Sequence, residues 1–117
     1  MRRVILNVVI LTVLLSNLSC LPYFGRKTVV IEISDVTQKI EKEIAIQIPE
    51  NRIVYKRKAY VTGKVDKKVR LNLVEIGPGK IDTVIYKGDH YGTKDYVKYE
   101  PLQATEGQLR LEVTFYY

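Results

Sequence analysis

The chain contains a single cysteine, so it can form no internal disulfide bond, and its stability must come from packing and backbone hydrogen bonds. It has one histidine, no tryptophan and no long amphipathic helical stretch. With one histidine and no nucleophile elbow, no Ser-His-Asp set can be proposed. No apolar run reaches the roughly 20 residues that a membrane-spanning helix needs. These absences favour a small non-catalytic domain.

The first twenty residues have the layout of a secretory signal peptide. Arg2 and Arg3 precede the apolar run Val4–Leu15, which is followed by small polar residues. An uncleaved membrane anchor is the weaker alternative, because the apolar stretch ends at residue 18 and contains polar side chains. The sequence therefore predicts a signal peptide over residues 1–19.

The end of this segment resembles the acceptor site of bacterial lipoprotein signals, in which a leucine and two small residues precede an acylated cysteine. Cys20 is the cysteine, and Ser19 is the small residue expected just before it. Leu15 and Leu18 lie near the positions of the aliphatic residues, whereas Asn17 stands where leucine is usual. The resemblance is thus to a degenerate acceptor site, and it covers only the first twenty residues.

The resemblance implies that the thiol of Cys20 receives diacylglycerol and that cleavage occurs just before it. The mature protein would then be lipid-anchored in a bacterial cell envelope, at the outer membrane. The alternative is an ordinary signal peptide cut near Ser19, which would leave a reactive free thiol on an exported protein. We expect three segments: a signal peptide (1–19), a lipidated cysteine with a short tether (20–27) and one domain (28–117).

The mature chain has the composition of a β domain. It is rich in tyrosine, valine, isoleucine and threonine, and apolar and polar residues alternate with a period of two from Lys27 onward. The predicted strands cover residues 28–34, 39–48, 51–65, 68–76, 80–88, 96–102 and 108–117. Seven short strands predict an all-β fold, a small antiparallel β-sandwich, with a small closed β-barrel as the alternative. A short helix beginning at Asp35 is the one competing local pattern.

Two of these strands carry specific expectations. In the last strand, alternate residues from Leu109 to Phe115 should point inward. The strand that contains Pro101 should lie at a sheet edge, because proline cannot donate a ladder hydrogen bond.

The loop Gly88–Asp95 places Asp89, His90 and Asp95 close together, but their spacing matches no metal-ligand pattern. Its residue types are those of a surface turn. We therefore expect an exposed connection without a metal, and no cofactor. Carboxylates that could converge in space, such as Asp89 and Glu100, are too common to indicate catalysis.

Positive charge is concentrated in one stretch. Residues 52–70 sum to +7, whereas residues 28–50 sum to −3 and residues 71–117 to −2. The plain interpretation is a solvated surface whose lysines protect a sheet edge. The functional interpretation is contact with a polyanion.

The register of this stretch can be predicted as a hairpin. If Val65 and Val69 both face the core, the connection is residues 66–68, and Lys64 lies directly opposite Arg70. Such a like-charge pair costs stability and suits an anion site. The candidate anion-binding face is Lys58, Tyr60, Lys64 and Arg70.

The sequence therefore predicts a cell-envelope lipoprotein that acts as a non-catalytic binding or structural module. Its expected partners are the membrane, through the lipid, and an anionic glycan, lipopolysaccharide or lipid head group; no nucleic acid is expected. A soluble exported enzyme or inhibitor is one alternative. An outer-membrane β-barrel component is another, suggested by the aromatic C-terminus, although a lipid anchor would be redundant there. The sequence does not indicate an oligomeric state.

Overall fold

The computed structural model of the chain describes residues 25–117. The predicted signal peptide and Cys20 lie outside the described residues, and so do the first four residues of the predicted tether, 21–24. Within the described part, no helix is long and apolar enough to cross a membrane.

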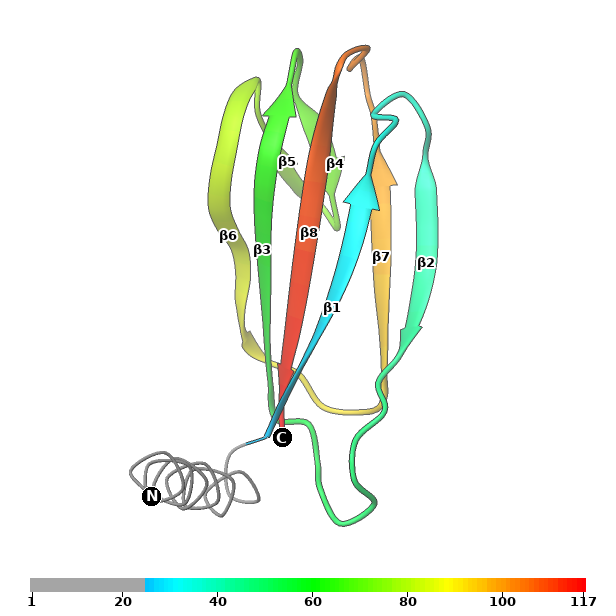
Figure 1. The fold of residues 1–117 in the computed structure, drawn as a ribbon, viewed down its shortest axis with the longest axis vertical. Helices are drawn as coiled ribbons and strands as arrows, with labels where there is room; N and C mark the ends of the chain where they lie inside the picture. Colours follow the sequence, from blue (N-terminus) through cyan, green and yellow to red (C-terminus); the bar gives the residue numbers. More distant parts are fainter. Residues whose placement is uncertain (1–24) are drawn as a thin grey trace, which may run out of the picture.

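The structure is an antiparallel β-sandwich of two four-stranded sheets (Figure 1). The strands are β1 (Arg26–Ile33), β2 (Ile40–Ala45), β3 (Lys56–Val65), β4 (Val69–Leu71), β5 (Val74–Ile76), β6 (Gly79–Asp89), β7 (Lys94–Glu100) and β8 (Gly107–Tyr116). Sheet A has the order β1-β8-β3-β6, and sheet B has the order β2-β7-β4-β5. The predicted sandwich is confirmed, and the closed alternative is wrong because each sheet ends in two edge strands.

The period-two alternation in the sequence places the core between the sheets. Leu109, Leu111, Val113 and Phe115 of β8 are each at most 2% exposed, which confirms the inward face predicted for this strand. Tyr99 of β7 is fully buried, and its hydroxyl donates to the Val36 carbonyl at 2.7 Å. The buried apolar residues of both sheets form one core between them.

The helix considered at Asp35 does not form. The Asp35 carboxylate accepts hydrogen bonds from the backbone N–H of Thr37 at 3.0 Å and from its hydroxyl at 2.5 Å. These bonds close a turn between β1 and β2. They also lower the pKa of Asp35, the bond from the hydroxyl being the larger cause.

Two expectations about the strands are corrected. The stretch predicted as one strand over residues 68–76 is the tight hairpin β4–β5, in which Asn72 and Leu73 have φ of 46° and 73°. Strand β7 is not at an edge, since it lies between β2 and β4. Pro101 follows the last residue of β7 and therefore removes no ladder hydrogen bond.

The predicted hairpin register is also wrong. Val65 pairs with Gly79 of β6 and Gly107 of β8 in sheet A, whereas Val69 pairs with Ile76 in sheet B. Residues 66–68 therefore carry the chain from one sheet to the other. Both valines face the core, as predicted, but they do so from opposite sheets.

Asp66 stabilises this crossing. Its carboxylate accepts hydrogen bonds from the Thr105 N–H (3.0 Å), the Thr105 hydroxyl (2.6 Å) and the Glu106 N–H (3.1 Å). These bonds, the one from the Thr105 hydroxyl first, lower the pKa of Asp66 to about 2. The connections β3–β4 and β7–β8 are thereby tied together at the end of the sandwich farthest from Gly25 (Figure 1).

Candidate anion-binding face

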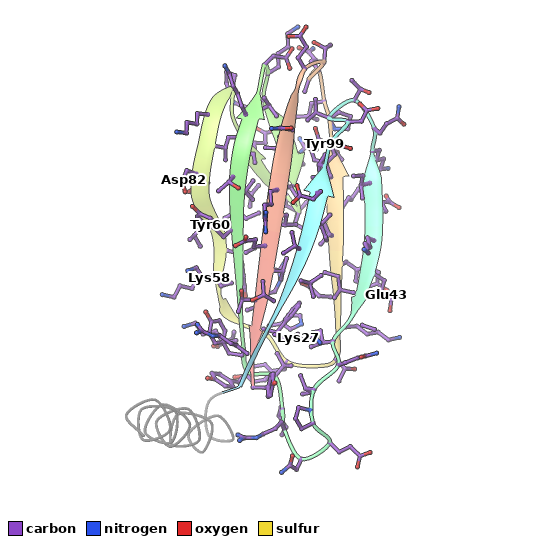
Figure 2. All side chains as sticks on the ribbon, viewed as in Figure 1. Lys27, Glu43, Lys58, Tyr60, Asp82 and Tyr99 are labelled. Atoms are coloured by element: carbon purple, nitrogen blue, oxygen red, sulfur yellow. The ribbon has the colours of Figure 1, made fainter. Side chains whose placement is uncertain are left out.

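Three of the four predicted site residues share one surface. Lys58, Tyr60 and Lys64 alternate with buried residues along β3 and point away from sheet B, on the outer face of sheet A. Figure 2 shows Lys58 and Tyr60 on this strand, with Asp82 beside them on β6. Arg70 does not belong to this group, because β4 lies in sheet B. The predicted set is therefore correct for β3 and wrong for Arg70.

The like-charge pairing predicted for Lys64 exists with a different partner. Lys64 lies opposite Lys80 in the β3–β6 ladder, and Lys58 lies opposite Lys87 in the same ladder. Side chains directly opposite in an antiparallel pair have Cβ atoms about 4.5–5.5 Å apart, so equal charges there are destabilising. The outer face of sheet A thus contains two such lysine pairs.

Within the described residues the lysines on this face form no ion pair, although Asp89 lies opposite Lys56 in the β3–β6 ladder. We call the following residues the basic face: Lys56, Lys58, Lys64, Lys80 and Lys87. Among the ion pairs formed within residues 25–117, none includes a member of the basic face. The ammonium of Lys56 instead lies 5.1 Å from the ring centroid of Tyr116.

On the outer face of sheet B, basic side chains form ion pairs with glutamates. Arg70 contacts Glu75 at 3.1 Å and Glu100 at 3.3 Å, and the contact with Glu75 is the main cause that raises the pKa of Arg70. Lys98 and Lys94 each contact a glutamate as well. Sheet A also has a paired cation, since Arg110 contacts Glu32 at 3.6 Å and Glu112 at 3.2 Å, but the lysines of the basic face take part in no such pair within residues 25–117.

Tyr60 is hydrogen-bonded within the basic face. Its hydroxyl donates to the carboxylate of Asp82, and this bond is the first cause that raises the pKa of Tyr60. In the structure this hydroxyl is engaged, so the ring of Tyr60 is the part that a ligand can contact.

A shallow hollow of about 210 Å³ lies on the same face, across β1, β8 and β3. Its lining is Arg26, Thr28, Lys58, Tyr60, Glu112, Thr114 and Tyr116. The Thr28 and Thr114 hydroxyl oxygens are 3.0 Å apart, and the Glu112 carboxylate contacts Arg110 at 3.2 Å. Hydroxyl groups beside two cationic side chains form a surface suited to phosphate, sulfate or carboxylate groups.

No protein-family model matches the sequence, and no curated protein is detectably similar to it.

Arg57 belongs to the basic stretch of the sequence but not to the basic face. Its side chain is 9% exposed and points between the sheets, where Nε lies 2.6 Å from Oδ2 of Asp95. The guanidinium also lies 5.0 Å from the ring centroid of Tyr86. This pair was not predicted from the sequence, although a signal was present. Arg57 occupies the same set of alternate, inward-facing positions of β3 as Ala59 and Val61.

The predicted loop Gly88–Asp95 is shorter than expected, because its ends belong to β6 and β7. Only residues 90–93 connect the strands. Asp95 is buried in the ion pair with Arg57, and the His90 ring packs against Phe115 with centroids 5.8 Å apart. Within the described residues, no group of three or more His, Cys, Asp and Glu side chains has the arrangement of a metal site.

Proposed function

We propose that this protein is a lipid-anchored module of a bacterial cell envelope that binds anionic groups through the basic face without catalysing a reaction. The ligands are the phosphate or carboxylate groups of an envelope glycan, of lipopolysaccharide or of lipid head groups. The anchor is the acylated thiol of Cys20.

The observation that carries the proposal is the pairing of lysine with lysine within the basic face. A fold gains nothing from the lysine pairs Lys58–Lys87 and Lys64–Lys80, since each pair costs stability. The ion pairs on the outer face of sheet B, and those of Arg110 on sheet A, show that other basic side chains of this domain are neutralised by carboxylates. Lysines that lie opposite one another and form no ion pair are expected where an external anion completes the charge balance.

The environment of the only histidine supports a non-catalytic role. His90 Nε2 lies 3.1 Å from the Lys94 carbonyl oxygen, and the ring packs against Phe115. The imidazole therefore helps to hold the connection between β6 and β7.

Neutralising the basic face tests the proposal. The variant Lys58→Gln with Lys64→Gln should lose retention on a sulfated dextran matrix at low salt, and also binding to purified lipopolysaccharide and to anionic vesicles. Screening limits such attraction to about 8 Å at physiological ionic strength, so binding by the native protein should weaken steeply as salt is added. Comparing lipopolysaccharide with vesicles identifies the source of the anionic group.

The matched control removes the same charge from the other sheet. In the variant Lys94→Gln with Lys98→Gln, both lysines come from exposed ion pairs on the outer face of sheet B. This variant should bind like the native protein. Equal losses in the two variants would mean that net charge, and not the basic face, is responsible, and no retention of the native protein at low salt would end the proposal.

A further inference from the structure

One end of the sandwich brings together the start of the described chain, the C-terminus and two connections (Figure 1). Gly25 and Tyr117 exchange backbone hydrogen bonds of 3.0 Å and 2.9 Å. The Tyr55 N–H donates to the Tyr116 carbonyl at 3.0 Å, and the His90 N–H donates to the Tyr55 carbonyl at 3.3 Å. We call this end, with residues 46–55 and 90–93, the docking end.

The connection between β2 and β3 extends beyond the strands at the docking end (Figure 1). The Arg52 N–H donates to the Pro49 carbonyl at 3.0 Å and closes a turn at its tip. Val54 is 1% exposed and fixes the returning chain to the core, so its neighbours point outward. Ile53 is 73% exposed and Tyr55 is 48% exposed, so the tip of this connection presents an apolar surface to its surroundings.

Further residues give the docking end the composition of a membrane interface. Tyr91, in the adjacent connection, is 70% exposed. Arg52 precedes Ile53 and Lys56 follows Tyr55 in the sequence, and Arg26 begins β1 at the same end. Glu50 is the one acidic residue of the connection between β2 and β3. Tyrosines beside exposed aliphatic and basic residues are typical of protein surfaces that enter the head-group region of a bilayer.

The chain that precedes Gly25 identifies the surface that this end faces. Only five residue steps separate Cys20 from Gly25. Fully extended, five residues span at most about 18 Å. An acyl group on Cys20 would therefore hold the docking end within that distance of the bilayer.

We propose that the docking end lies on the lipid surface, with Ile53 inserted at the boundary between head groups and acyl chains and with Tyr55 and Tyr91 at the level of the head groups. This inference rests on the proposed acylation of Cys20. The basic side chains of this end contact lipid phosphates. One acyl chain gives only marginal membrane binding, so a second contact strengthens attachment and fixes the orientation of the domain.

The orientation has a consequence for the basic face. With the docking end on the membrane, the strands of sheet A rise away from the bilayer. Lys64 lies six residues beyond Lys58 along β3, which is about 20 Å farther from the membrane. The pair Lys64–Lys80 would then be presented to groups that project from the membrane surface.

The test uses tryptophan as a depth probe, because the chain has none of its own. Full-length protein carrying Ile53→Trp is purified from membranes and reconstituted into vesicles of phosphatidylcholine and phosphatidylglycerol with brominated acyl chains. Insertion by about 5–10 Å should lower the emission at least about twofold relative to vesicles without bromine. Tyr91→Trp reports on the same end independently. Leu102→Trp is the control, since Leu102 is 44% exposed at the opposite end and should not be quenched.

Each result is decisive. Quenching of Ile53→Trp and Tyr91→Trp, but not of Leu102→Trp, supports the docking end. If acylated protein shows equal emission from all three variants with and without bromine, the docking inference is wrong while the lipid anchor stands. If the purified protein carries no acyl group, the anchor and the docking inference both fail.

Discussion

The ion pair between Arg57 and Asp95 should be the most sensitive polar contact of the domain. It joins β3 of sheet A to β7 of sheet B, and its side chains are 9% and 11% exposed. Asp95→Ala removes the carboxylate and leaves the guanidinium of Arg57 between the sheets. The face of Tyr86 then remains as a partial partner.

The expected loss follows from the burial of the charge that remains. Breaking a buried ion pair by removing one partner typically costs about 3–5 kcal/mol. A domain of this size is expected to have about 5–14 kcal/mol of total stability. Each kcal/mol corresponds to roughly 4–8 °C, so the melting temperature should fall by at least about 12 °C.

The assay is urea unfolding followed by circular dichroism, with a double-mutant cycle. Arg57→Met combined with Asp95→Ala should be more stable than Asp95→Ala alone, because no unpaired charge remains. Glu43→Ala is the control, since its ion pair with Lys94 is exposed and should contribute at most about 1 kcal/mol. If Asp95→Ala costs no more than Glu43→Ala, the pair does not connect the sheets as argued.

Three further predictions concern the fold. Burial raises the pKa of Tyr99 to about 12. The stability that the protonated Tyr99 hydroxyl contributes is therefore complete below about pH 10 and is lost as the pH rises through 12. The Tyr99→Phe variant should show a smaller alkaline decline in its unfolding midpoint than the native protein. Gly107→Ala should lower the free energy of unfolding in urea by at least about 2 kcal/mol, because the added Cβ would lie 2.0 Å from the Lys64 carbonyl oxygen. Gly92→Ala is the control, since its Cβ would meet no atom within 4 Å and the variant has only the backbone strain of a φ of 113°. Leu73→Gly should raise the free energy of unfolding by about 1 kcal/mol, because glycine adopts the φ of 73° without strain and the leucine side chain, 90% exposed, contributes little packing. An unchanged unfolding midpoint would contradict the strain argument.

The faces of the strands could be predicted from the sequence because alternation is a local property. The residues of β8 and of β3 have the orientations that their period-two pattern indicates. The pairing of strands is not local. The chemistry of residues 66–68 suits a hairpin as well as a crossing between sheets, and only the hydrogen bonds of Asp66 to Thr105 and Glu106 decide for the crossing.

The turn at Asn72 and Leu73 was missed for a chemical reason. Two-residue hairpin turns of this kind usually have glycine at the second position, where φ is positive. Leucine stands there instead, so the sequence contains no glycine signal at residue 73. The stretch therefore resembled one continuous strand.

For the candidate site too, the local features could be predicted from the sequence, whereas the strand pairing could not. The basic character and outward direction of Lys58 and Lys64 follow from the sequence of β3. Their partners Lys80 and Lys87 could not be found, because β6 follows β3 in the chain only after β4 and β5. The wrong partner, Arg70, was chosen because a hairpin with residues 66–68 as its connection would place it directly opposite Lys64.

The most direct test of the account is the mass of the N-terminal peptide of the mature protein, isolated from the membrane fraction of cells that produce the full chain. We predict that this peptide begins at Cys20 and carries the mass of a diacylglycerol group, with or without an additional amide-linked acyl chain. Cys20→Ala should yield an unprocessed precursor or a protein that mild washing releases. A peptide that begins elsewhere, or that begins at an unmodified Cys20, would contradict the proposal that this domain is a lipid-anchored module of the envelope.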